Sequence, residues 1–198
     1  MSVTVEDFST STSTHLASAF EQIVQQRRSV HFYLERNVPR PLLERALDLA
    51  VHAPSHYHTR PWRFTVFAGN ARDELAAAYE KAAMRIGWHP APARRRAYEA
   101  PVSVVIGCVP DNRHPRLRPL EEEFATAAAT QNLMLALTSL QLVSALNSAP
   151  WQVSEEVEEL VGIGAGRVVG VLQVGYRDPA RELLKRPQPT TAGVVHWR

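Results

Sequence analysis

The chain has 198 residues, of which 45% are hydrophobic and 21% are charged, and its formal net charge is +2. This length and composition predict a globular protein with a single core. The net charge is too small to indicate binding to nucleic acid or to a membrane surface. A single cysteine, Cys108, excludes an internal disulfide and a cysteine-rich metal site, and its apolar surroundings predict a buried, inert thiol.

No apolar run reaches the roughly 18 to 20 residues that a membrane-spanning helix needs. The start of the chain shows no basic segment followed by an apolar one, the pattern of a secretory signal. We therefore expect a cytoplasmic protein.

A stretch rich in serine and threonine at the start of the chain predicts a flexible lead-in over residues 1–14. Apolar residues then recur at helical spacing and predict a helix over residues 15–26. The next three residues are Arg27, Arg28 and Ser29, whose guanidinium groups and hydroxyl together could hold a phosphate. The alternative is a solvated basic helix end, whose cations complement the helix dipole.

A corner rich in hydrogen-bonding side chains follows a second predicted helix, whose apolar run extends from Leu42 to Ala50. Pro54 ends that helix and Pro61 precedes a predicted strand, because each proline fixes its own φ and restricts the residue before it. The polar and aromatic residues of this corner are His52, Ser55, His56, Tyr57, His58 and Arg60. Such a set suits a flat polar ligand, although any one of these histidines alone would be read as part of a surface loop. A zinc site is the weaker alternative, since no carboxylate stands near the histidines.

The remaining pattern predicts further helices and strands in alternation. Strands are expected at residues 63–67, 101–109 and 167–176, with a helix at residues 71–86 and a short helix after Ser154. The glycines of residues 162–166 could suggest a nucleotide-binding loop, but such a loop requires a strand before it and a long helix after it, and both are missing here. We therefore expect a turn that connects two elements. Arg94, Arg95 and Arg96 predict either a solvated helical face or a lid that attracts a phosphate-bearing cosubstrate.

The longest helical signal covers residues 120–146 and is apolar on nearly every side. A helix of this kind must be buried all round, so a second subunit is its natural partner surface. The tail from residue 178 onward contains Lys185 and Arg186 and ends in apolar residues, and we expect it to dock onto the protein.

Several of these motifs occur in an order that resembles the nitroreductase family, in its small-subunit branch, over about residues 15 to 198. They are Arg27-Arg28-Ser29, Ala53-Pro54-Ser55-His56, Pro61-Trp62-Arg63-Phe64, Gln131-Asn132-Leu133, Val174-Gly175-Tyr176 and Lys185-Arg186-Pro187. The resemblance implies a single α+β domain over residues 15–198, with a central mixed sheet flanked by helices. It also implies a homodimer whose interface contains the long central helix, with FMN in two grooves between the subunits.

The activity implied by the resemblance is the reduction of small-molecule acceptors, such as nitroaromatics and quinones, by a ping-pong exchange with NADH or NADPH. Because the flavin carries the redox chemistry, no catalytic acid or base is expected from the chain. The cofactor-binding residues carried over by position are Arg27, Arg28 and Ser29 for the FMN phosphate and ribityl chain, His52, Pro54, Ser55 and His56 for the flavin, Asn147 and Ser148 for the flavin from the partner side, and Lys185 or Arg186 for the phosphate.

The chain departs from the family pattern at three places. His58 and Arg60 stand where many members have asparagine and glutamine, Gln141-Leu142-Val143 replaces a common Gly-Leu-Gly, and Leu146 stands near a frequent tryptophan. These departures leave two alternatives open. One is a protein of the same fold with different flavin chemistry, such as flavin fragmentation or reductive dehalogenation, and the other is a non-catalytic flavin-binding protein.

Overall fold

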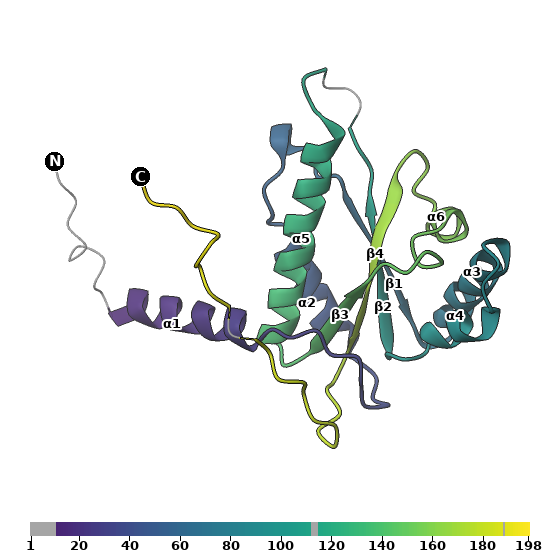
Figure 1. Ribbon diagram of the computed structural model, residues 1–198, viewed down its shortest axis with the longest axis horizontal. Helices are drawn as coiled ribbons and strands as arrows, with labels where there is room; N and C mark the ends of the chain where they lie inside the picture. The colour runs from purple at the N-terminus through teal and green to yellow at the C-terminus, as the bar shows by residue number, and fades with distance from the viewer. Residues whose placement is uncertain (1–10, 112–114, 188) are drawn as a thin grey trace.

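The computed structural model describes residues 11–111, 115–187 and 189–198. At its centre lies a four-stranded sheet in the order β1-β2-β4-β3 (Figure 1). The strands are β1 (Trp62–Ala68), β2 (Val102–Cys108), β3 (Val143–Asn147) and β4 (Arg167–Gly175). β2 is buried along its whole length, as its almost wholly apolar sequence predicts. β1 and β3 form the two edges of the sheet.

Helices cover both faces of this sheet. α2 (Arg40–Ala50) and α5 (Pro119–Ser139) lie on one face, while α3 (Arg72–Arg85), α4 (Pro90–Arg96) and α6 (Glu155–Val161) lie on the other (Figure 1). Short 3-10 turns follow at residues 56–58 (η2) and 69–71 (η3).

The alternating side chains of β2 divide the core into two layers. Val104 and Ile106 pack in the cluster that includes Leu137 of α5, whereas Val105 packs with Leu75 of α3. The α+β architecture that the resemblance implied, with a central sheet flanked by helices, is therefore confirmed. The expectation of a mixed sheet needs a correction. All ladders between the described strands are antiparallel, and the parallel pairing is a single bridge between Ser29 and Ser144.

The long helix is shorter than predicted. α5 ends at Ser139, Gln141 takes a left-handed backbone conformation with φ of 61°, and the chain then forms β3. The predicted helix over residues 120–146 is thus wrong in its last part. One side of α5 is buried against the sheet, but the side chain of Phe124 on the other side is 63% exposed. The chain itself therefore does not enclose this helix.

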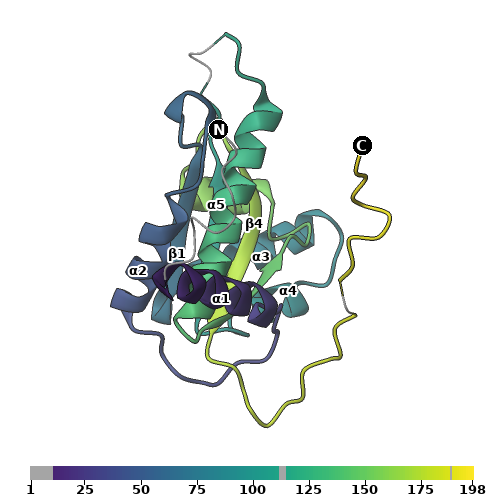
Figure 2. The same ribbon diagram turned by 90° about the vertical axis from the view of Figure 1, so that its left-hand side faces the viewer.

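The first helix, α1 (Ser11–Gln26), projects from the body of the molecule, as Figures 1 and 2 show. Residues 11–14, predicted as part of the lead-in, belong to this helix, and residues 1–10 lie outside the described residues. The apolar end of the tail does not dock within the chain, since Trp197 is 94% exposed.

Other expectations hold. The predicted strands at residues 63–67, 101–109 and 167–176, and the helix at residues 71–86, agree with β1, β2, β4 and α3 to within two residues. Cys108 is buried, and burial raises the pKa of its thiol. Within the described residues, no helix is both long enough and apolar enough to span a membrane.

Candidate functional site

A cluster of cations gathers where α1 ends. Arg27 and Arg28 are half-buried there, and the tail folds back so that Arg186 donates to the Arg27 carbonyl oxygen at 3.4 Å. Arg28 in turn donates to the Leu184 carbonyl oxygen. Burial lowers the pKa of Arg27, and the charges of Arg186 and Arg28 lower it further. Three guanidinium groups are thus held together, and among the described residues none of them has a carboxylate partner.

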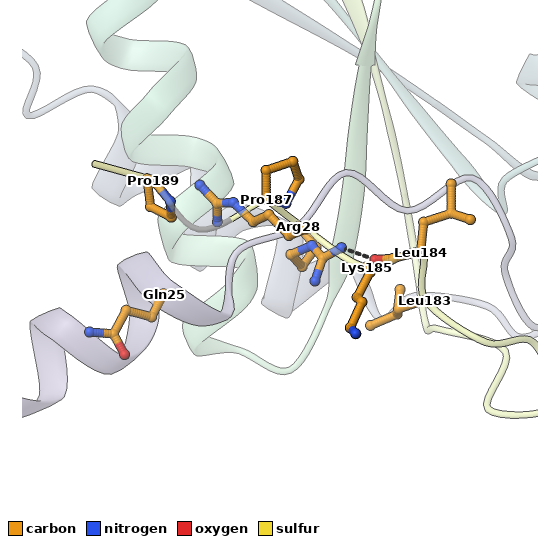
Figure 3. Close-up of a pocket in the computed structure, with 8 residues that line it drawn as sticks. Gln25, Arg28, Leu183, Leu184, Lys185, Pro187 and Pro189 are labelled. Atoms are coloured by element: carbon orange, nitrogen blue, oxygen red, sulfur yellow. Dashed lines mark hydrogen bonds between the residues drawn. The ribbon is translucent and has the colours of Figure 1, made fainter. Parts of the chain in front are cut away.

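Two of these cations, Arg28 and Arg186, line a hollow of about 730 Å³, whereas Arg27 is not part of its lining. Its lining comes from the end of α1 and from the returning tail, namely Gln25, Arg28, Leu183, Leu184, Lys185, Arg186, Pro187 and Pro189 (Figure 3). The two groups of predicted phosphate-binding residues, 27–29 and 185–186, lie far apart in the sequence. The fold brings them close together. Like charges gathered around an open hollow provide paired donors for an anion.

The segment after the cluster runs along the free edge of β3. The Val30 amide donates to the Ser144 carbonyl oxygen at 3.1 Å, and Ser29 forms a bridge with Ser144. Because backbone groups alternate in direction along a strand, the amide and carbonyl of Leu146 face the same free edge. Asn147 and Ser148 follow, roughly 10 Å beyond Ser144 at the rise of a strand. These two residues therefore share an edge with Ser29 of their own chain.

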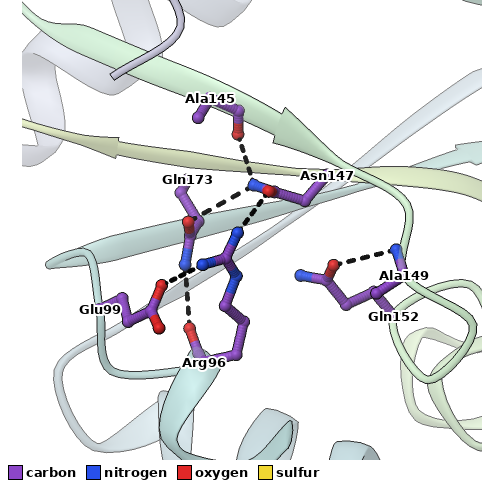
Figure 4. Close-up of polar contacts among 7 residues, drawn as sticks. All are labelled: Arg96, Glu99, Ala145, Asn147, Ala149, Gln152 and Gln173. Atoms are coloured by element: carbon purple, nitrogen blue, oxygen red, sulfur yellow. Dashed lines mark hydrogen bonds and ion pairs between the residues drawn. The ribbon is translucent and has the colours of Figure 1, made fainter. Parts of the chain in front are cut away.

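The side chain of Asn147 is already engaged. Its Oδ1 accepts a hydrogen bond from an Nη atom of Arg96 at 2.6 Å, and its Nδ2 donates to the Ala145 carbonyl oxygen at 2.9 Å (Figure 4). Nδ2 also lies 3.4 Å from Oε1 of Gln173. Sequence reasoning proposed Asn147 as a flavin contact, but its amide is turned toward α4 and β4. The groups at this strand end that remain open to a ligand are therefore backbone groups and the exposed Ser148.

The histidine corner forms a second, smaller hollow of about 350 Å³. Its lining residues are Val51, His52, Ala53, Pro54, Ser55, His58 and Arg60. Oγ of Ser55 accepts from the Arg60 amide at 3.2 Å, which closes the loop on itself. His56 does not line this hollow. It lies near Glu121, at the start of α5. Hydrogen bonds from Arg118 are the main cause that lowers the pKa of Glu121, and His56 makes a smaller contribution in the same direction.

A buried carboxylate fixes the corner to α5. Glu122 is 1% exposed, and its two carboxylate oxygens accept from the Thr59 hydroxyl at 2.6 Å and from the Asp111 amide at 3.1 Å. Sequence reasoning missed Glu122, Arg96 and Gln173, because their partners lie far away along the chain. Across the described residues, no group of three or more histidine, cysteine or acidic side chains could hold a metal ion.

The corner and the cationic cluster lie at diagonally opposite ends of the sheet. The corner precedes Trp62, which pairs with Cys108 at one end of β2. Ser144, beside the cluster, pairs with Val174, which pairs with Val102 at the other end. The separation is roughly 20 Å along the strands and about 14 Å across them. One chain therefore does not bring its two groups of predicted site residues together.

The order of the strands and the helices on both faces of the sheet define an α+β class of protein, and the sequence comparison identifies the family. The chain belongs to the nitroreductase family, whose model matches residues 24–176. It is 25% identical to the putative NAD(P)H nitroreductase YfhC of Bacillus subtilis over 179 residues, which cover 87% of this chain and 91% of that protein.

Two further proteins are similar to this chain. Nitroreductase NfnB of Mycolicibacterium smegmatis is 37% identical over 76 residues, which are 38% of this chain and 32% of that protein. The solved structure of FMN-dependent NfnB from Mycobacterium smegmatis, in complex with NADPH, has a TM-score of 0.76 at 21% identity and covers 92% of this chain and 99% of its own. Iodotyrosine deiodinase, solved with FMN and 3-iodo-L-tyrosine, has a TM-score of 0.66 at 20% identity, with 86% of this chain and 96% of that chain covered. At these identities, the two structures establish the shared fold.

Proposed function

We propose that this protein is an FMN-dependent NAD(P)H oxidoreductase that reduces small acceptors such as nitroaromatics or quinones. The observation that carries the proposal is the cluster of Arg27, Arg28 and Arg186 beside an open hollow. A gathering of cations without carboxylate partners is stabilised by an anion, and the FMN phosphate supplies one. Family membership and the FMN and NADPH named for NfnB support the choice of cofactor.

The groove that we propose starts at the cationic cluster and follows the free edge of β3. Arg27, Arg28 and Ser29 hold the phosphate, with Arg186 or Lys185 beside them, and the edge near Leu146 meets the flavin ring. When bound, FMN would supply the hydride-transfer chemistry that links NADH or NADPH to the second substrate. The chain supplies binding, orientation and a groove open to two substrates in turn.

We propose further that the histidine corner reaches this groove from a second copy of the chain. The corner lies too far from the cluster to complete the same groove within one chain. α5 and the apolar hollow beside it offer a surface for that second copy. This hollow, of about 360 Å³, is lined in part by Phe124, Met134 and Leu146. A homodimer would bury these residues and set His52, Pro54, Ser55 and His56 of each copy against the partner's groove.

The test is flavin binding by the purified protein. We expect the wild type to carry a flavin absorbance spectrum, or to quench FMN fluorescence on titration. Arg27→Ala should weaken FMN binding by more than 1 kcal/mol, because charge-assisted hydrogen bonds contribute roughly 1.5 to 3 kcal/mol each. Arg95→Ala, which removes an exposed arginine from α4, is the matched control and should bind as the wild type does. A wild type that binds no flavin would refute the proposal.

Reductive dehalogenation is a second candidate, favoured by the shared fold of iodotyrosine deiodinase. The two activities differ in their products. Halide release from a halogenated phenol, without comparable turnover of nitroaromatics or quinones, would assign dehalogenation to the same groove. Consumption of the flavin itself would indicate fragmentation instead.

A further inference from the structure

The three consecutive arginines at the end of α4 have different surroundings. Arg94 forms an ion pair with Glu80 at 2.8 Å, and Arg95 is exposed. The side chain of Arg96 is only 26% exposed, and it turns toward the sheet (Figure 4). The sequence alone offered a solvated face or a lid for this stretch, and Arg96 fits neither.

Arg96 belongs to a closed ring of hydrogen bonds. Its guanidinium donates to Oδ1 of Asn147 at 2.6 Å, and Nδ2 of Asn147 lies 3.4 Å from Oε1 of Gln173. Nε2 of Gln173 then donates to the Arg96 carbonyl oxygen at 2.9 Å. A second Nη of Arg96 pairs with Glu99. The planar fork of one arginine thus engages Glu99 and Asn147 from two separate nitrogens in a fixed geometry, which the single nitrogen of a lysine does not provide.

The ring holds the end of an edge strand. Asn147 is the last residue of β3, and Gln173, which is 1% exposed, lies on the neighbouring strand β4. Asn147 is also the residue directly after Leu146, whose backbone faces the free edge. Fixing the Asn147 side chain therefore fixes the direction of the Leu146 amide and carbonyl, and it keeps the Asn147 amide out of the groove.

We propose that Arg96 is a positioning residue of the flavin groove, which acts through Asn147 to hold the end of β3 against the flavin ring. The proposal rests on the proposed function, because it assumes that FMN lies along this edge. Arg96 itself does not touch the cofactor. Its effect passes through the hydrogen bonds that Asn147 and Gln173 make.

Arg96→Gln and its control Arg95→Gln test the proposal in two ways. In the protein without FMN, hydrogen exchange of the amides at residues 146–149 should become at least fivefold faster in Arg96→Gln and stay unchanged in Arg95→Gln. The dissociation constant for FMN, from fluorescence titration, should rise at least fivefold in Arg96→Gln alone. If Arg96→Gln does not fold, Arg96→Lys replaces it, and its smaller loss of affinity should still exceed that of Arg95→Gln.

A double-mutant cycle with Asn147→Ala distinguishes positioning from a general loss of structure. Because Arg96 acts through Asn147, the double variant Arg96→Gln/Asn147→Ala should bind FMN within twofold of Asn147→Ala alone. Losses that multiply across the two single variants would overturn the proposal, as would Arg96→Gln binding FMN as tightly as Arg95→Gln. If the wild type binds no flavin, the proposed function fails instead, and the exchange rates alone decide whether Arg96 fixes the strand end.

Discussion

Backbone strain is concentrated at the histidine corner. Among the described residues, the non-glycine residues with positive φ are Tyr57, His58, Arg60 and Gln141, and the first three belong to the corner. Such conformations cost free energy and persist where the surrounding structure imposes them, often at binding sites. In this corner the Arg60 amide donates to Ser55 and the neighbouring Thr59 hydroxyl donates to Glu122. Strain at this place agrees with the proposed binding role of the corner.

Gln141 also has a positive φ, but it lies in the turn between α5 and β3 and not in a candidate binding site. It is exposed, with φ of 61°, at the place where the family pattern commonly has a glycine. Gln141→Gly should therefore raise the free energy of unfolding, by about 0.5 to 1 kcal/mol, since glycine adopts this conformation without a steric penalty. Urea denaturation measures the change.

Ala77→Gly is the control for that substitution. Ala77 is also exposed but lies inside α3, where glycine should lower the free energy of unfolding by about 1 kcal/mol. Opposite signs at the two positions are expected. Destabilisation by both substitutions would show that the left-handed turn at Gln141 carries no relievable strain.

At the scale of elements, one ion pair ties α3 to α6. Arg85 donates to both carboxylate oxygens of Glu156, at 2.7 and 3.2 Å, and the side chain of Glu156 is only 6% exposed. Hydrogen bonding from Arg85 is the main cause that lowers the pKa of Glu156 to about 2. A carboxylate with a lowered pKa stabilises the fold above its unfolded pKa of about 4.3, and this contribution is lost as the pH falls from about 5 toward 2.

Glu156→Gln should reveal that contribution. At pH 7 the variant should be less stable than the wild type by about 1 kcal/mol, less than the full pKa shift implies, because the half-exposed Arg85 leaves the pair open to solvent screening. The difference should shrink as the pH falls toward 3, as followed by urea denaturation at each pH. A gap that stays constant between pH 7 and pH 3 would contradict this role of the Glu156 carboxylate.

The sequence predicted most elements because their patterns are local. The apolar runs of β2 and β4 and the spacing of α3 identify these elements without tertiary information. β3 was missed because the run 142–146 is mostly apolar and fits a helix as well as a strand, and no glycine or proline separates it from α5. The left-handed conformation of Gln141 separates α5 from β3, and its energetic cost cannot be recognised from the sequence pattern.

The candidate site shows the same division. Arg27 to Ser29 form a contiguous motif, so the sequence alone was enough to propose them as a phosphate site. The destination of the Asn147 side chain depends on Arg96, which lies 51 residues away in the chain. No spacing rule relates two such residues, so only the packing of α4 beneath β3 and β4 reveals that they are partners.

At the scale of the whole molecule, large apolar side chains remain exposed on α1 and α5. They include Leu16, Phe20 and Phe124, with exposed fractions of 68%, 60% and 63%. An isolated chain rarely exposes so much apolar surface in one region, and a second copy would cover it. We expect light scattering at micromolar concentration to give twice the 22.1 kDa mass of one chain.

Phe124→Glu should dissociate that dimer, because the substitution places a charge in the apolar face of α5. Met84→Glu is the control, since Met84 is 56% exposed on α3, on the other side of the sheet. The control should retain the dimeric mass. A wild type of 22.1 kDa, or equal behaviour of the two variants, would argue against a subunit interface at α5.

The central claim is that each flavin groove combines the cationic cluster of one chain with the corner of another. Subunit mixing tests it most directly. Arg27→Ala/Arg28→Ala removes the cluster, Ser55→Ala/His56→Ala alters the corner, and each variant alone should bind FMN weakly at both of its grooves. A heterodimer of the two, isolated through different affinity tags, regenerates one groove with both parts intact. We predict one tightly bound FMN per heterodimer. A heterodimer that binds FMN no better than its parent variants would contradict the shared groove.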